Sequence, residues 1–181
     1  MKHFILGTIL FFTITSTLHA QQTIFDQTFE TLEEGANVLK LKKGKFATWG
    51  KGKWQVTEQK KKGNNKSNKF ASSDGVEGTT LVQYANLEAG ATYEFSVAVK
   101  ITNAGGVAWK TNYSVKAMSG KKGDSHEYGG DILKEPGEGK WKEHKMKFTV
   151  IEGRERVTLS VYRWAKDIVL NVDDFKLVKL K

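Results

Sequence analysis

The chain has 181 residues, no cysteine, one proline and a formal charge of +9, with 29 basic and 20 acidic side chains. This length suits one domain or at most two small ones, and 39% hydrophobic with 11% aromatic residues is enough for a packed core. The absence of cysteine excludes disulfides, thiolate metal sites, a cysteine nucleophile and an acylated cysteine anchor. The net charge is typical of a nucleic-acid binder, so its distribution along the chain matters.

Residues 1–20 have the layout of a secretory signal peptide. Met1-Lys2-His3 gives a positive start, residues 4–12 are an apolar run, and a polar stretch ends at Ala20. The apolar run is shorter than the roughly 20 residues that a membrane span needs, and no later segment is long enough. We therefore expect cleavage after Ala20, a secreted or periplasmic mature chain of residues 21–181, and no membrane span.

The positive charge is concentrated in residues 40–69. This segment holds eleven lysines and one acidic residue, Glu58, so the rest of the mature chain is nearly neutral. A solvated lysine-rich loop is one interpretation, and a contact surface for a polyanion is the other. Trp49 and Trp54 lie within the segment and favour the second interpretation. Because export makes nucleic acid a poor candidate, we expect an acidic or sulfated polysaccharide as the partner, and no nucleic acid.

Several segments alternate apolar and polar side chains with the period of two that predicts β-strands. These segments are 92–101, 109–118, 141–150 and 156–164. Glycine clusters separate them, and no segment shows a helical stripe of useful length. The residues expected on their core faces include Tyr93, Phe95, Val97, Val99, Ile101, Trp109, Tyr113, Val115, Ala117, Met146, Phe148, Val150, Val157, Leu159 and Val161.

The last predicted strand changes phase along its length. Leu170 and Val172 share one face, whereas Phe175 and Leu177 share the opposite one, so we expect a β-bulge at Asp173-Asp174. Many short strands separated by turns predict an all-β fold. We expect an antiparallel β-sandwich of the jelly-roll type, formed as one domain.

A series of short motifs runs through nearly the whole mature chain. The motifs are Phe25–Glu30, Trp49, Leu81–Tyr84, Thr92–Ser96, Trp141 and Val172–Leu177. Their order resembles that of the carbohydrate-binding modules of families four and nine and their jelly-roll relatives. The lysine-rich segment departs from the family, which is usually neutral to acidic there. The resemblance implies non-catalytic polysaccharide binding, in the company of separate polysaccharide-degrading enzymes.

The resemblance also implies a structural Ca²⁺ site. Its ligands would be Glu30, Asp173 and Asp174, whose hard carboxylate oxygens suit calcium. Hydrogen-bonded carboxylates that close a turn are the alternative for the same residues.

Sugar rings stack their CH faces on aromatic side chains, while their hydroxyl groups need polar or charged partners. Tyr162 and Trp164 fit this chemistry, since they alternate out of phase with the core residues of their strand. Edge packing under a loop is the alternative for both, and loop anchoring is the alternative for Trp49 and Trp54. We expect the polar candidates to line one sheet face. The polar candidates for ligand binding are Gln83, Lys100, Lys110, Asn112 and Lys116.

Two other classes of function stay open. His126 and Tyr128 lie in a glycine-flanked loop, and a His/Tyr pair beside a cation can serve β-elimination in a polysaccharide lyase. The chain has no HExxH motif, nucleophile elbow, Walker loop or zinc-ligand spacing. A small lyase or hydrolase is therefore the enzymatic alternative to a non-catalytic binder. A structural surface or assembly protein is the third class.

Overall fold

The computed structural model describes residues 21–41, 46–50, 52–60, 67–105, 112–121, 123–133 and 138–181. These residues form eleven β-strands and one short 3-10 helix. The elements are β1 (Gln22–Gln27), η1 (Val38–Lys40), β2 (Phe46–Ala47), β3 (Trp54–Lys60), β4 (Ser67–Ser73), β5 (Thr79–Asn86), β6 (Thr92–Thr102), β7 (Tyr113–Lys121), β8 (Asp124–Leu133), β9 (Lys142–Thr149), β10 (Arg156–Arg163) and β11 (Val169–Lys179). Within these ranges, nothing helical has the length and apolar character that crossing a membrane requires.

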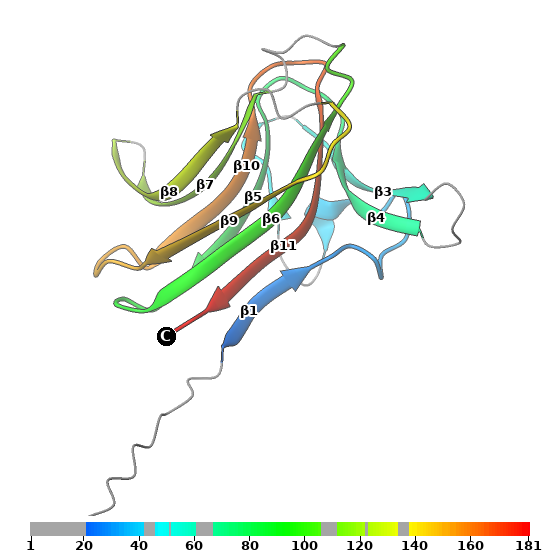
Figure 1. The fold of residues 1–181 in the computed structure, drawn as a ribbon. Helices are drawn as coiled ribbons and strands as arrows, with labels where there is room; N and C mark the ends of the chain where they lie inside the picture. Colours follow the sequence, from blue (N-terminus) through cyan, green and yellow to red (C-terminus); the bar gives the residue numbers. More distant parts are fainter. Residues whose placement is uncertain are drawn as a thin grey trace, which may run out of the picture.

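The strands form two antiparallel sheets that pack face to face. Sheet A has the order β3-β4-β11-β6-β9, with β1 also paired to β11, and sheet B has the order β2-β5-β10-β7-β8. Figure 1 shows β8, β7, β10 and β5 in one layer and β9, β6, β11 and β1 in the other. The predicted all-β sandwich with a jelly-roll fold is confirmed.

Strand β11 changes its neighbour halfway along. Its first half pairs with β4 at Asn171 and Val172, and its second half pairs with β1 from Phe175 onward. The ladder to β6 shifts register between Asp173 and Lys176, and the backbone of Asp174 has a φ of 49°. The predicted bulge is therefore confirmed, and it lies where the neighbouring strand changes. Because a bulge adds one residue, Val172 and Phe175 can both face the core.

The core lies between the sheets and is built from alternate residues of the strands. All the expected core residues that the structure describes are buried, apart from the half-buried Met146; Trp109 lies outside the described residues. Phe175 joins strands from both sheets, since its ring centre lies 5.0 Å from that of Phe95 and 5.2 Å from that of Phe46. The alternation in the sequence thus correctly predicted which residues of these strands face the interior of the sandwich.

Three strands lie where the sequence suggested loops. Strands β3 and β4 form an antiparallel pair that begins in the lysine-rich segment and ends at Ser73, and the buried Trp54 and Val56 give β3 an apolar face. Strand β8 includes the glycine-flanked segment around His126 and pairs with β7 along its length. A Cβ at Gly130 would lie 2.5 Å from the carboxylate of Glu127, so here glycine marks a close approach within a strand.

We predict that Trp54→Ala lowers the free energy of unfolding by about 3–5 kcal/mol, because it removes a large side chain that is 1% exposed. Trp164→Ala is the matched control, since Trp164 is 64% exposed and its loss should change stability by less than about 0.5 kcal/mol. Urea denaturation of both variants measures the difference. Equal losses would contradict the assignment of Trp54 to the core.

Candidate functional site

The outer face of sheet B presents side chains in rows that cross three strands. The inward positions of β10 are filled by Val157, Leu159 and Val161, so the residues between them must face outward. Because β5, β10 and β7 pair in register, their outward residues align, with about 6.6–6.8 Å between successive rows. The rows are Thr80–Tyr162–Ser114, Val82–Ser160–Lys116 and Tyr84–Thr158–Met118.

A cleft of about 620 Å³, which we call the aromatic cleft, opens over this face. Trp49, Tyr162 and Trp164 supply aromatic lining, and Ile132 from β8 adds an aliphatic side chain. The ring centres of Tyr162 and Trp164 are 5.9 Å apart, with an angle of 49° between the ring planes. Trp164 is the most exposed large apolar residue described, although exposed aromatic surface is unfavourable in water. The cleft therefore offers ring faces to a ligand.

Local contacts hold the two tryptophans in place. The N–H of Gly78 donates to the carbonyl of Trp164 at 2.9 Å, and the indole ring lies 3.8 Å from the point where a Cβ would stand at Gly78. Trp49 follows the short strand β2, and its indole N–H donates to the hydroxyl of Tyr84 at 2.8 Å. Both indoles are thus positioned by residues of or next to β5.

Polar groups lie between the aromatic residues. Thr80, Ser114 and Ser160 contribute hydroxyl groups to the lining, and Asn112 contributes an amide. Lys116 also lines the cleft, where its ammonium group lies 2.6 Å from the carboxylate of Glu127. The combination of ring faces with hydroxyl and amide groups is what sugar rings require.

A second cleft of about 470 Å³, which we call the arginine cleft, lies on the same sheet, and Trp49 lines both clefts. Tyr84 and Arg156 also line it, and the guanidinium carbon of Arg156 lies 5.4 Å from the centre of the Tyr84 ring. Arg154 lies at its rim, where it donates to the backbone carbonyl of Asp124 at 2.8 Å and to the carboxylate at 2.6 Å.

The structure brings together five of the predicted ligand-binding residues. All five line the aromatic cleft, and Trp49 also lines the arginine cleft. They are Trp49, Asn112, Lys116, Tyr162 and Trp164. Lys110 lies outside the described residues.

Three predicted ligand-binding residues lie elsewhere, and each prediction was wrong for a physical reason. Trp54 faces the core from β3. Gln83 pairs with Leu159 and faces the interior, because Leu81 and Val82 are both apolar and left the phase of β5 ambiguous. Lys100 projects from β6 of sheet A, where its ammonium group lies 4.5 Å from the Phe70 ring centre and 2.7 Å from Gln59 Oε1.

Sequence reasoning missed several lining residues of both clefts, among them Tyr84, Met118, Ile132 and Arg156. Arg156 and Tyr162 are an even number of residues apart in β10, so the alternation that placed Tyr162 on the outer face could also have placed Arg156 there. No comparable signal exists for Ile132, because β8 was expected to be a loop.

The described lysines of the segment 40–69 do not gather at either cleft. Lys40 ends η1, and Lys69 donates from its ammonium group to the carbonyl of Leu32 at 2.8 Å. Lys53 is exposed, and its backbone N–H donates to the carboxylate of Asp74. The other lysine side chains of the segment lie outside the described residues. A polyanion surface made by this segment stays a prediction.

The candidate calcium residues lie around the bulge in β11. Asp173 accepts hydrogen bonds from the amide of Asn68 at 3.3 Å and from the N–H of Asp174 at 2.9 Å, while Glu30 accepts from the N–H of Lys69. Burial raises the pKa of Asp173 to about 7, and the charges of Asp174 and Glu30 act in the same direction. Within the described part of the chain, no three His, Cys, Asp or Glu side chains form a group that could hold a metal ion. The contacts fit turn-closing carboxylates, and calcium stays a prediction.

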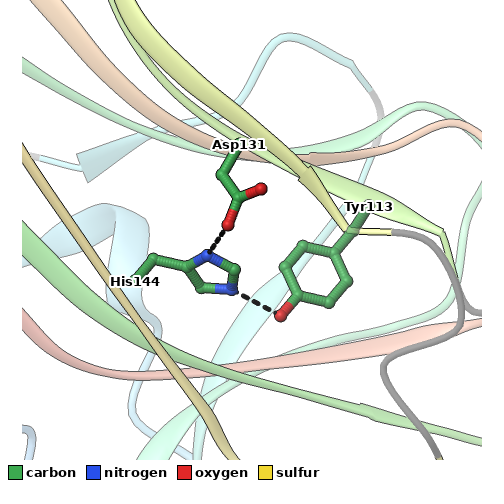
Figure 2. Close-up of polar contacts among 3 residues, drawn as sticks. All are labelled: Tyr113, Asp131 and His144. Carbon is green, nitrogen blue, oxygen red and sulfur yellow. Dashed lines mark hydrogen bonds and ion pairs between the residues drawn. The ribbon is translucent and has the colours of Figure 1, made fainter.

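One Tyr-His-Asp network lies between the sheets at the β8–β9 edge (Figure 2). His144 contacts the hydroxyl of Tyr113 through Nε2 at 2.6 Å and the carboxylate of Asp131 through Nδ1 at 2.8 Å. Since a carboxylate only accepts, Nδ1 carries a proton, and a neutral His144 accepts from Tyr113. Tyr113 and His144 are both 3% exposed, whereas the Asp131 side chain is 49% exposed, so the network closes the sandwich edge and only its carboxylate end reaches solvent.

The His126/Tyr128 pair of the lyase alternative lies on β8, not in a loop. The two rings are in edge-to-face contact, with their centres 4.8 Å apart. The hydroxyl of Tyr128 donates to the carbonyl of Arg154 at 2.9 Å and accepts from the N–H of Ile151. This hydroxyl therefore anchors the β9–β10 turn.

We predict that His144 makes part of the stability depend on pH. Burial lowers its pKa below 6.5, against the opposing effect of Asp131, so the folded state holds it neutral while the unfolded state protonates near pH 6.5. Its contribution is present above about pH 6.5 and declines as the pH falls. The difference in unfolding free energy between the native protein and His144→Gln should therefore shrink from pH 7.5 to pH 5. A constant difference would contradict this.

We predict from the family resemblance that calcium binds at the bulge and raises the melting temperature relative to a chelator. Ligand at 100 times its Kd stabilises by about 2.7 kcal/mol. Asp174→Asn should abolish this rise in melting temperature, and the control Asp167→Asn should keep it. The two variants are matched because both residues have positive φ, which asparagine tolerates. Equal melting temperatures in calcium and chelator would support the turn-closing role instead.

Comparisons with known proteins give a likeness in structure only. No family model matches the sequence. No curated protein matches it either.

The similar solved structures include carbohydrate-binding modules. The C-terminal family 22 module of Clostridium thermocellum Xyn10B superposes with a TM-score of 0.61 at 11% identity, covering 87% of this chain and 93% of that one. The CBM22-1 xylan-binding domain of Paenibacillus barcinonensis Xyn10C gives 0.59 at 16% identity, with coverages of 90% and 97%. A family 4 module gives 0.55 at 16% identity, with coverages of 84% and 97%. The chain thus has the jelly-roll fold of these modules, as its sequence motifs indicated.

Proposed function

We propose that the protein is an exported, non-catalytic polysaccharide-binding protein. It holds a glycan chain against the outer face of sheet B. The observation that carries this proposal is the aromatic cleft, where the exposed rings of Trp49 and Trp164 and the half-buried ring of Tyr162 surround a floor of hydroxyl and amide groups.

The chemistry of the cleft matches a sugar ring on two counts. The CH face of a sugar stacks on an aromatic ring, and this burial of apolar area stabilises the complex. Ser114 and Ser160 can exchange hydrogen bonds with sugar hydroxyls, since each side chain both donates and accepts, whereas the hydroxyl of Thr80 already donates to the carbonyl of Gly78 at 3.2 Å. The lining includes residues of four strands, β5, β7, β8 and β10, and a site spread over four strands suits a chain better than a compact small molecule.

The fold supports the same proposal. The neighbours with this fold include a xylan-binding domain, and the family resemblance of the sequence motifs implies binding without catalysis. In the Tyr-His-Asp network at the β8–β9 edge, Tyr113 and His144 are buried, and their arrangement gives no reason to add a catalytic step. Export is part of the proposal because of the signal-peptide layout of residues 1–20.

We also propose that the bound polysaccharide is acidic and that the protein assists its degradation by separate enzymes. The lysine-rich composition of residues 40–69 supports a preference for negative charge. Co-purification with secreted polysaccharide-degrading enzymes would test the second part. Association with structural surface proteins instead would favour the assembly role.

We predict that Trp164→Ala and Tyr162→Ala each weaken glycan binding by roughly 30-fold, or about 2 kcal/mol, because each removes a stacking surface in the cleft. Native affinity electrophoresis in gels containing xylan, glucan, alginate or pectin measures the retardation. Trp141→Ala is the matched control, since Trp141 is an exposed tryptophan just before β9 of the other sheet, next to Lys100.

Retardation that Trp141→Ala abolishes and Trp164→Ala leaves intact would move the site to sheet A. No retardation of the native protein in any gel would contradict polysaccharide binding. New reducing ends or unsaturated products after incubation with these polymers would show an enzyme.

A further inference from the structure

We propose that the arginine cleft is a second subsite that binds the negatively charged substituent of the polysaccharide, with Arg156 as the residue that contacts it. The inference rests on the proposed function and adds to it. It places the direct contact with the charged group on an arginine of sheet B, and the lysine-rich segment is not part of this subsite.

Arg156 lies on the outer face of sheet B, and no described carboxylate neutralises its charge, so this charge is available to a ligand. The other three cations that line the two clefts have described partners: Lys116 pairs with Glu127 at 2.6 Å, Arg154 pairs with Asp124 at 2.6 Å, and Arg163 donates to the carbonyl of Asn112. Across the described ranges, Arg156 has no carboxylate within ion-pair distance. Its guanidinium group stacks on the face of Tyr84, which leaves the edge of the guanidinium group able to donate.

The neighbours of Arg156 hold it over the cleft. Tyr84 accepts the indole N–H of Trp49 through its hydroxyl at 2.8 Å, so the ring under the guanidinium group is fixed. A cation stacked on an aromatic ring loses less rotamer freedom when it binds an anion. The carboxylate of Glu155, which also lines the cleft, already accepts the N–H of Gly153 at 2.8 Å.

The space beside Arg156 is kept free by glycine. A Cβ at Gly120 would lie 2.1 Å from the carbonyl oxygen of Asp124 and 3.0 Å from Arg154 Nη1. Gly120 has a φ of 100°, which other residues rarely adopt. A side chain at this position would displace Arg154 and narrow the cleft, so the backbone geometry maintains an open site of about 470 Å³.

The two clefts are placed to bind one chain. Arg156 and Tyr162 face the same side of β10 and are six residues apart, which is about 20 Å along a strand. Trp49 lies between them and lines both clefts. A polysaccharide that stacks a ring on Tyr162 or Trp164 therefore extends toward Arg156, where a charged group several sugars away can meet it.

The ligand class follows from the guanidinium group. Its planar N–H donors match the two oxygens of a carboxylate or a sulfate ester. The carboxylate of a uronic acid and the sulfate ester of a sulfated sugar share this chemistry. Neutral sugars lack it, so Arg156 should set a preference between charged and uncharged forms of one polymer.

The test compares matched polymers with matched variants. The probes are glucuronoxylan and alginate, each beside a sample whose carboxyl groups have been reduced to alcohols, and sulfated xylan beside unsulfated xylan. The proteins are the native chain, Arg156→Gln, and Lys147→Gln, which removes an equal charge from an exposed position on sheet A. Affinity electrophoresis at low and at physiological salt gives the ratio of Kd values for each pair.

We expect the native protein to bind the charged form of at least one pair about tenfold more tightly, or about 1.4 kcal/mol. Arg156→Gln should bring this ratio to about one without weakening binding of the uncharged form, and Lys147→Gln should keep the ratio. Preference within the carboxyl pairs assigns a uronic acid, and preference within the sulfate pair assigns a sulfate ester.

Two results would overturn the subsite. One is that the native protein binds the charged and the uncharged form of every polymer pair with equal Kd values. The other is that Arg156→Gln keeps the native preference for the charged form. If the native protein binds the uncharged polymers and loses them on Trp164→Ala, the proposed function stands without the subsite. Binding of none of the polymers would remove both.

Discussion

The two-residue alternation of β10 is the constraint on which the rest of the structure depends. Val157, Leu159 and Val161 are completely buried between the sheets, and this burial is the main driving force for the packing of sheet B on sheet A. Side chains of a strand alternate, so the same burial directs Thr158, Ser160 and Tyr162 to the outer face. The core and the aromatic cleft are therefore two sides of one strand. A shift of one residue in its register would exchange them.

The neighbouring strands extend this constraint across the face. Since β10 pairs with β5 on one side and with β7 on the other, the three strands carry their outward residues in common rows. Tryptophans from outside the rows then complete the site, with Trp49 from the chain after β2 and Trp164 just beyond β10. Their rings stay exposed because nothing in the described part of the fold covers them, whereas Trp54 is taken into the core by the equally regular alternation of β3.

The parts of the fold that sequence predicted are those where one face is apolar and the other polar. Strands β6, β7, β9 and β10 have this pattern, and it placed Tyr162 correctly on the outer face. The phase change in β11 located the bulge for the same reason. Strand β5 was different, because Leu81 and Val82 are both buried and either phase was possible. Gln83 was therefore assigned to the wrong face, and only pairing of Leu159 with Gln83 decides it. Strands β3 and β8 were not predicted, because the lysine-rich composition around β3 and the glycines in β8 suggested loops.

The sequence by itself determined that the chain is a β-sandwich with aromatic residues out of phase with its core, because alternation and glycine spacing are local properties. It also established that positive charge is concentrated in one segment. Only the tertiary structure decided which charged and aromatic groups meet, because residues such as Trp49, Tyr84 and Arg156 are brought together by pairing between distant strands. Lys100 and Lys116 look alike in the sequence, yet they project from opposite sheets, since strand order, and not sequence proximity, assigns each strand to a layer.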